Sequence, residues 1–226
     1  MLREIAHFVR SAPEVMKLQK ELPRAEFADA LNTKADAQGY AAIRRELVEG
    51  LSGRVLEVGC GTGSMFQYYP AAVTGLEAIE PEADFRGIAV AKAEKSSGRI
   101  RATAGDGMAL AYDDRSFDAV VFGLVLCSVP SVERVVAEAF RVLRPGGAFR
   151  ALEHVRSERA VGGALMDLMN PFWLKLNKQG CNWNRNPLAA IRASGVVIDE
   201  VKPFQRFDTV VPAFPMVRIR GHRPEA

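Results

Sequence analysis

The sequence predicts an α/β protein built on a doubly wound, mostly parallel β-sheet, with an antiparallel pair of strands at the end and an N-terminal helical cap. Three observations predict this fold. From residue 54 onward, short runs rich in β-branched residues alternate with helical stretches, which is typical of a parallel sheet with crossover helices. A glycine-rich turn follows the first run, and the last two runs are joined without an obvious long helix. With 226 residues, 48% of them hydrophobic, the chain is long enough for one sizeable domain of this kind.

The sequence of the N-terminal region predicts helices. Its apolar residues recur at helical spacing, and Pro23 marks a break between two segments. A further helix is expected over residues 40–49, where Gly50 ends it. We therefore divide the chain into a helical cap, residues 1–50, and a main domain, residues 51–226.

The sequence of the main domain predicts seven strands with helices between them. The strands are expected at residues 54–59, 72–80, 100–105, 117–125, 146–155, 196–204 and 213–221. The helices are expected at residues 65–69, 83–95 and 132–143. Because the last two strands are joined by a loop, we expect them to pair as an antiparallel hairpin at an edge of the sheet.

A glycine-rich turn follows the first strand, in the stretch VLEVGCGTG. Gly59, Gly61 and Gly63 allow a tight turn and let backbone N–H groups approach a ligand, while Cys60 can reach it only through its backbone. The N-terminus of the following helix offers partial positive charge to an anionic group. Such a pattern is also compatible with a plain strand-to-helix turn.

Glu57 separates the possible ligands of this turn. A dinucleotide places a doubly negative pyrophosphate there and disfavours a carboxylate, and Ser64 stands where the dinucleotide pattern requires its last glycine. A ligand with a cationic amine, a sulfonium and one small carboxylate suits both the acid and the helix end. S-adenosylmethionine is such a ligand.

Two further acids fall at the ends of the next two strands. Glu80, followed by Pro81, is in place to hold the two hydroxyls of a ribose, and we prefer it to Glu77 on the same strand. After the third strand, Asp106 can accept a hydrogen bond from an adenine amino group, in a turn with Gly107, while Met108 packs on the ring. The carboxyl ends of parallel strands form one crevice, so these groups are expected to share a site.

The motifs EVGCGTG, IEP, GDGMALAYDDRSFDAVV and VLRPGG occur in the order seen in class I S-adenosylmethionine-dependent methyltransferases of the type 11 group, which the sequence resembles. The resemblance covers the chain from about residue 54 and implies a Rossmann-like, seven-stranded sheet whose last strand is antiparallel. It also implies that the three glycines line the methionine end of the cofactor, that Glu80 holds the ribose, that Asp106 and Met108 hold the adenine, and that Leu124 lies under the cofactor.

A narrower resemblance concerns the methyl acceptor. LVLCSV, LEHV and NPFWLKLNKQGCNWNR are similar to segments of animal alkyl-thiol S-methyltransferases and their bacterial relatives. The animal enzymes carry a hydrophobic N-terminal anchor that this sequence lacks, so a membrane or lipid-droplet setting is not carried over. The expected acceptor is a small, fairly apolar thiol, phenol or amine. Two alternatives stay open: a phospholipid or quinone-ring methyltransferase at a membrane surface, and a non-catalytic S-adenosylmethionine-binding partner subunit.

The candidate residues on the acceptor side are fewer. His154, after the fifth strand, is either a base or substrate-orienting donor, or a histidine satisfied in a polar loop. Trp173 and Trp183 could wall an apolar acceptor site or pack in a helical insertion. Tyr40, before the cap helix, could close over the site. A thiol ionises near neutrality, so its methylation does not require a base.

Composition excludes several other classes. The net charge of +3 is spread along the chain without a basic stripe, so we expect no nucleic-acid partner. Three cysteines, Cys60, Cys127 and Cys181, lie far apart without a C-x-x-C pair, which predicts reduced thiols in the cytoplasm rather than a disulfide or metal site. No apolar run is long enough to span a bilayer. The sequence does not predict the oligomeric state.

Overall fold

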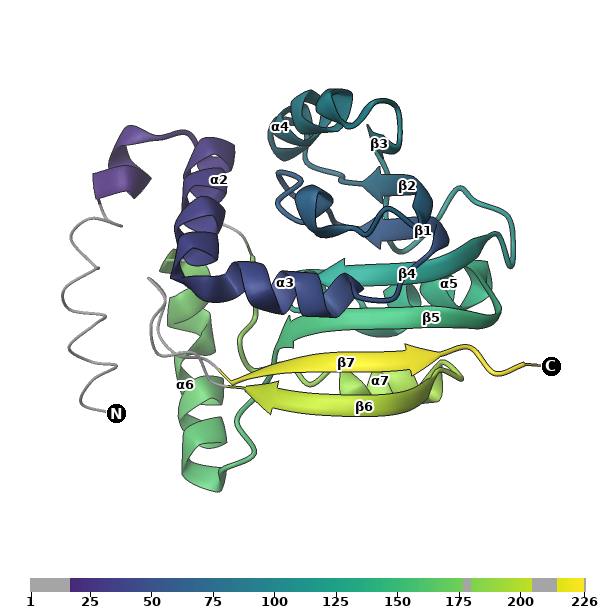
Figure 1. Ribbon diagram of the computed structural model, residues 1–226. Helices are drawn as coiled ribbons and strands as arrows, with labels where there is room; N and C mark the ends of the chain where they lie inside the picture. The colour runs from purple at the N-terminus through teal and green to yellow at the C-terminus, as the bar shows by residue number, and fades with distance from the viewer. Residues whose placement is uncertain (1–16, 177–179, 205–214, 226) are drawn as a thin grey trace.

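A seven-stranded sheet forms the centre of the computed structural model, which describes residues 17–176, 180–204 and 215–225 (Figure 1). The strand order is β3-β2-β1-β4-β5-β7-β6. β7 pairs antiparallel with both of its neighbours, and the other pairs are parallel. The strands are β1 (Gly53–Val58), β2 (Val73–Ile79), β3 (Ile100–Thr103), β4 (Phe117–Gly123), β5 (Leu143–His154), β6 (Val197–Phe204) and β7 (Met216–His222). The predicted fold class, including the antiparallel terminal strand, is confirmed.

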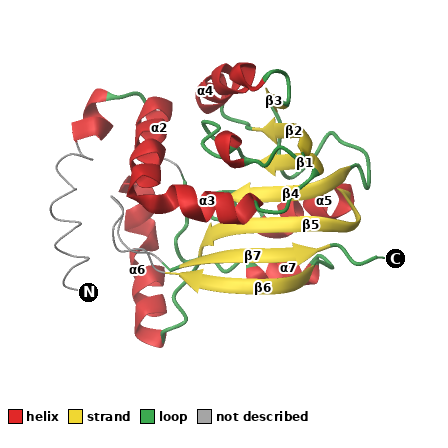
Figure 2. Ribbon diagram, viewed as in Figure 1, coloured by secondary structure: helices red, strands yellow, loops and turns green. Residues whose placement is uncertain are grey.

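Helices cover both faces of the sheet, which makes it doubly wound (Figure 2). The helices are α2 (Arg24–Ala35), α3 (Ala41–Val48), α4 (Ala83–Ala93), α5 (Val132–Val142), α6 (Ala160–Leu176) and α7 (Leu188–Ala193). Buried residues of α5 and α7 share one core cluster with the sheet, and buried residues of α3 and α4 share the other. Each face of the sheet therefore has its own hydrophobic core.

The sequence of β4 and α5 shows why this packing forms. β4 lies in the middle of the sheet, and five of its seven residues are buried, as expected for a strand covered on both faces. α5 buries Val132, Val135, Val136, Ala139 and Val142, which recur at helical spacing on one side. Its first turn is capped by Ser131, whose side chain accepts a hydrogen bond from the backbone N–H of Arg134.

The N-terminal helices precede the sheet in the chain, and α2 contacts α4 at two places. Pro23 is the residue before α2, as its predicted role as a break requires, and a π-helical turn (Asp36–Tyr40) links α2 to α3. Ion pairs of Arg24 with Glu82 and of Lys92 with Asp29 join α2 to the start and end of α4. The predicted helix over 40–49 corresponds to α3.

Some predicted bounds need correction. The helix expected over 65–69 is a 3₁₀-helix (Phe66–Tyr68), because the glycine turn runs up to it and Pro70 follows it. β5 begins at Leu143, and its pairing with β4 is irregular near its start, where Pro145 cannot donate a ladder hydrogen bond. The first two residues of the strand expected over 213–221 lie outside the described residues, as does the helical stretch before residue 17.

Within the described part of the chain, no helix combines the length and apolar character needed to cross a membrane.

Candidate active site

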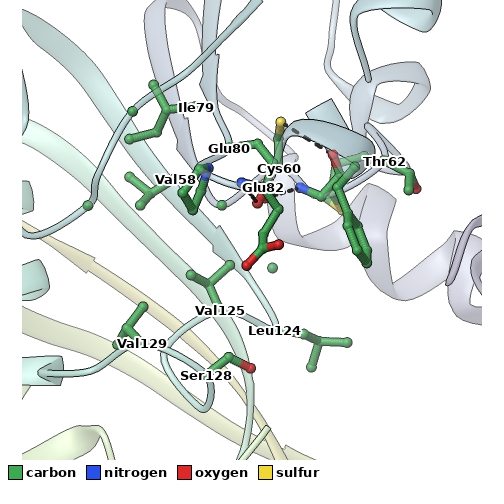
Figure 3. Close-up of a pocket in the computed structure, with 18 of the residues that line it drawn as sticks. Val58, Cys60, Thr62, Ile79, Glu80, Glu82, Leu124, Val125, Ser128 and Val129 are labelled. Carbon is green, nitrogen blue, oxygen red and sulfur yellow. Dashed lines mark hydrogen bonds between the residues drawn. The ribbon is translucent and has the colours of Figure 1, made fainter. Parts of the chain in front are cut away.

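A cavity of about 570 Å³ opens at the carboxyl ends of the central parallel strands (Figure 3). Its volume is in the range of small-molecule sites. Residues from the turns after β1, β2, β3 and β4 line it, and Figure 3 shows Leu124, Val125, Ser128 and Val129 on the side opposite Glu80 and Cys60. Of the predicted cofactor residues, nine line the cavity: Gly59, Cys60, Gly61, Glu80, Pro81, Asp106, Gly107, Met108 and Leu124.

Gly61 and Gly63, in the turn after β1, are required for different reasons. Gly61 has φ +56°, and a Cβ there would meet nothing within 4 Å, so this position faces open space in the cavity. Gly63 has φ +73°, and a Cβ there would lie 2.5 Å from the ring of Phe66. Gly61 thus leaves room for a ligand, whereas Gly63 leaves room for the protein's own core.

Glu80 holds the turn after β1 and the start of the next turn at the cavity in place. Its Oε2 accepts a hydrogen bond from the backbone N–H of Gly61 at 2.9 Å, and its Oε1 accepts one from the backbone N–H of Glu82 at 3.0 Å. Burial raises the pKa of the Glu80 carboxyl, and these two backbone donors oppose that shift. Glu77, the other acid on β2, lies outside the cavity lining and near Arg54 and Arg101.

Asp106 organises the turn after β3. Its Oδ1 accepts a hydrogen bond from the backbone N–H of Met108 at 2.8 Å, and its carbonyl accepts one from the N–H of Ala109. This turn holds Met108 at the cavity wall, where the sequence predicted it.

Leu124 has a left-handed backbone conformation, with φ +64°, which is rare for a branched side chain. The following turn is held by Glu153, whose carboxylate accepts hydrogen bonds from the backbone N–H groups of Val125, Leu126 and Cys127 at 2.9, 3.0 and 3.4 Å. Burial raises the pKa of Glu153 to about 7. No local pattern in the sequence predicts this role, because the contact joins residues more than 25 positions apart.

Glu57 lies behind the cavity wall and is absent from its described lining. The side chain is fully buried, and Oε2 accepts a hydrogen bond from the Tyr69 hydroxyl at 3.0 Å. Burial raises the pKa of Glu57 to about 8, although the Tyr69 hydrogen bond and the Arg44 charge oppose the shift. Gly63 is also absent from the described lining.

One wall of the cavity comes from the N-terminal helices, which sequence reasoning missed. Arg24, Ala28 and Asn32 of α2 and Arg44 of α3 line it. Arg44 is buried and donates hydrogen bonds to Asp36 Oδ2 at 2.8 Å and to Asn32 Oδ1 at 2.5 Å. The signal that the sequence offered for this wall was Arg44 itself, a charged residue on the buried face of α3.

The residues expected on the acceptor side do not line the cavity. The Tyr40 hydroxyl donates to Met216 Sδ at 2.7 Å. Trp173 and Trp183 stack with ring centroids 4.8 Å apart, and their indole N–H groups donate to the carbonyls of Cys181 and Met166. Their described contacts are those of a packed insertion around α6.

The fold brings together two cysteines and a histidine that are far apart in the sequence. One ligand atom each from Cys127, His154 and Cys181 lie within 4.8 Å of one another. Cys181 Sγ is 3.6 Å from His154 Nδ1. A hydrogen bond with Cys181 and burial raise the pKa of the Cys127 thiol. The sequence predicted no such cluster, because His154 ends β5 whereas Cys127 and Cys181 come from two separate loops.

Comparisons with known proteins identify the family of this chain. Residues 56–151 match the family described as methyltransferase domain. The chain is 38% identical to thiol S-methyltransferase TMT1A of Homo sapiens over 68% of each chain, and 34% identical to thiol S-methyltransferase TMT1B of Rattus norvegicus over 61% of this chain and 58% of the relative. A putative methyltransferase structure from Bacillus halodurans superimposes with a TM-score of 0.69 at 16% identity, covering 81% of this chain and 98% of that one.

The chain therefore belongs to the class I S-adenosylmethionine-dependent methyltransferases, enzymes that methylate a small acceptor with S-adenosylmethionine as donor. Within that class, the similarity extends to proteins named thiol S-methyltransferases. The site fits the cofactor on two observations: the space that a Cβ at Gly61 would fill is open, and Glu80 and Asp106 stand at the ends of successive strands around it.

Proposed function

We propose that this enzyme transfers a methyl group to the sulfur of a small, fairly apolar thiol. The observation that carries the proposal is the make-up of the cavity, in which the polar groups gather on one side and an apolar wall from the turn after β4 stands on the other. Leu124, Val125 and Val129 form this wall together with Leu152 of β5. The similarity to thiol S-methyltransferases supports sulfur as the acceptor atom.

For the cofactor, we propose roles residue by residue. S-adenosylmethionine supplies an electrophilic methyl carbon on a sulfonium, which an acceptor displaces in line. Gly59, Cys60 and Gly61 offer backbone atoms to its methionine end, and Gly63 allows the turn to form. Glu80, next to Pro81, accepts from the ribose hydroxyls. Asp106, Gly107 and Met108 hold the adenine, and Leu124 lies beneath the cofactor. Glu57 is the candidate partner of the cofactor's cationic amine behind the glycine turn; because its pKa is raised to about 8, we propose that it ionises when that cation is bound.

On the acceptor side, the chain's main contribution is to position the acceptor and exclude water. A thiol needs little help from a base, so we propose His154 as a group that orients the acceptor sulfur rather than as an obligatory base. The substrate roles of Tyr40, Trp173 and Trp183 remain predictions, since their described contacts are with Met216, Cys181 and Met166.

We also propose that residues 1–50 act as a cap on the methyltransferase domain, residues 51–226. The contribution of Arg24, Asn32 and Arg44 to the cavity wall supports this division. The neighbouring Cys127 and Cys181 are both thiols, and we therefore propose a reducing compartment such as the cytoplasm. The cavity volume of about 570 Å³ favours a small molecule over a nucleic acid as the partner.

One mass-spectrometric assay tests the acceptor. The purified protein and S-adenosylmethionine meet a panel of alkyl and aryl thiols, phenols and amines, and S-adenosylhomocysteine is followed together with each methylated product. We expect methylated thiols. Turnover of phenols or amines without turnover of any thiol would overturn the proposal, and cofactor binding without any product would favour a non-catalytic binding subunit.

A second candidate is methylation of a lipid or quinone ring at a membrane surface. The observation that favours it is an apolar stripe on α6, where Val161, Leu165, Leu168 and Phe172 are 84%, 57%, 68% and 59% exposed. Phosphatidylethanolamine vesicles in the same panel test it. Product formed on vesicles, and not on soluble thiols, would favour this candidate.

A further inference from the structure

The Cys127–His154–Cys181 cluster has the donor set of a zinc site. Two thiol sulfurs and one imidazole nitrogen are the ligands that Zn²⁺ prefers, and catalytic zinc sites use three protein ligands with a fourth position left for water or substrate. In a tetrahedral zinc site with ordinary zinc–sulfur and zinc–nitrogen bond lengths, neighbouring ligand atoms lie about 3.5–3.8 Å apart. The observed 3.6 Å between Cys181 Sγ and His154 Nδ1 matches this edge, and the three ligand atoms lie within 4.8 Å of one another.

Three hydrogen bonds hold backbone groups of the cluster cysteines in place. The N–H of Cys127 donates to the buried carboxylate of Glu153, next to His154. The carbonyl of Cys127 accepts from the N–H of Asn182 at 2.9 Å, which ties the turn after β4 to the loop that carries Cys181. The carbonyl of Cys181 accepts from the indole N–H of Trp173 at 2.9 Å. Such outer contacts position metal ligands before the metal arrives.

The cluster also adjoins the cavity. Cys127 lies between Val125 and Ser128, which both line the cavity, and its Sγ is 3.5 Å from the Ser128 hydroxyl. On β5, Leu152 lines the cavity, and His154 follows two residues later, so both side chains project from the same face of the strand. Cys127 is buried, whereas His154 and Cys181 are partly exposed, which leaves a side from which a fourth ligand can approach.

We propose that Cys127, His154 and Cys181 bind one Zn²⁺ ion, and that its fourth position takes the sulfur of the acceptor thiol. This inference rests on the proposed thiol acceptor and deepens it. On binding, the thiol S–H bond breaks, its proton passes to solvent, and a zinc–sulfur bond forms. The zinc-bound sulfur then gives an electron pair to the methyl carbon as the bond from that carbon to the donor sulfonium breaks, and the neutral thioether leaves the metal.

Cobalt substitution tests the metal site without relying on activity. The protein is stripped with a chelator under reducing conditions and titrated with Co²⁺. We expect one equivalent to bind, with thiolate-to-cobalt charge-transfer absorption and the intense visible bands of tetrahedral cobalt, and Zn²⁺ to displace it. Cys181→Ser and His154→Asn should weaken this binding by at least roughly 100-fold. Cys60→Ser is the matched control, because Cys60 lies in the glycine turn away from the cluster.

Circular dichroism and binding of S-adenosylmethionine keep the result interpretable if a variant unfolds. Cys181 and His154 are the partly exposed members of the cluster, so their variants are the ones compared. Lack of the cobalt spectrum in the folded wild-type protein would overturn the site. Detection of a Cys127–Cys181 disulfide in protein kept under reducing conditions would also overturn it.

A second titration tests the fourth ligand. Adding an alkyl thiol to the cobalt protein should change the charge-transfer bands, whereas a phenol should not. If the stripped protein methylates thiols at an undiminished rate, the metal's role is overturned while the thiol activity stands. If the cobalt spectrum responds to thiols but no thiol is methylated, the zinc site stands and the proposed function fails.

Discussion

The carboxylate of Glu80, at the end of β2, accepts a hydrogen bond from the backbone N–H of Gly61, in the turn after β1, at 2.9 Å. The same carboxylate accepts from the N–H of Glu82 through its other oxygen. A single side chain thus fixes the two turns between which the cavity opens.

Glu80→Gln should weaken S-adenosylmethionine binding by about 10- to 100-fold. The reason is that one backbone N–H loses its acceptor, and an unpaired buried donor costs about 1–3 kcal/mol. An amide has one acceptor oxygen, so its NH₂ group would face either the Gly61 or the Glu82 N–H. Isothermal titration calorimetry measures the affinity. Glu77→Gln is the matched control, because Glu77 lies on the same strand outside the cavity lining. Equal losses in the two variants would contradict this account of Glu80.

Alanine at Gly61 and at Gly63 should separate binding from stability. Both positions have positive φ, so each variant loses about 1–2 kcal/mol from backbone strain. Gly63→Ala adds an overlap with Phe66 and should lose roughly 1–3 kcal/mol more. Gly61→Ala places its methyl group in the cavity and should bind the cofactor poorly while remaining folded. Urea unfolding and calorimetry on the same samples measure both effects. A Gly61→Ala protein that binds normally would show that this space is not used.

The raised pKa of Glu57 predicts how stability depends on pH. Since its pKa is about 8 in the folded protein, against 4.5 for an unperturbed carboxyl, the folded state holds the proton more tightly than the unfolded state. The stabilisation from this proton is complete below about pH 4.5 and is lost as the pH rises through about 8. The free energy of unfolding should therefore fall over this window by an amount on the order of a few kcal/mol.

Glu57→Gln isolates that contribution. The amide is neutral at every pH and its oxygen can still accept from the Tyr69 hydroxyl. Urea unfolding of both proteins from pH 5 to pH 9 should show a steeper decline in the wild type than in the variant. The difference between the two curves is the test, because other groups, including Glu80 and Glu153, also have a raised pKa. Parallel curves would mean that Glu57 does not titrate in this window.

The Arg44–Asp36 pair should stabilise the cap. Both side chains are largely buried, and Asp36 Oδ2 accepts from Arg44 at 2.8 Å and from the Tyr68 hydroxyl at 2.9 Å. Arg44→Ala leaves the Asp36 charge without its cation and should lower the free energy of unfolding by about 3 kcal/mol. A double-mutant cycle with Asp36→Asn measures the coupling. Arg45→Ala, the exposed neighbour on α3, should change stability by no more than about 0.5 kcal/mol. A coupling near zero would contradict the pair's role.

Much of the cofactor side was predictable from the sequence, because its signals are local. A strand, a glycine turn and an acid at the end of the next strand can each be recognised from a short segment of sequence. Gly61, Glu80 and Asp106 all line the cavity. The sequence predicts Glu57 as a cofactor-binding residue, yet whether it faces the cavity or the protein depends on which side of the turn closes over it. The Tyr69 hydrogen bond shows that it faces the protein.

The sequence by itself determined the order of strands and helices and most of the turn residues that line the cavity, because hydrophobic periodicity and turn chemistry act over a few neighbouring residues. Only the tertiary structure decided what meets across the sheet. It placed Arg44 at the cavity wall, Glu153 beneath the turn after β4, and His154 between Cys127 and Cys181. These contacts join residues far apart in the chain, and their geometry follows from strand register and helix packing, which no local pattern encodes.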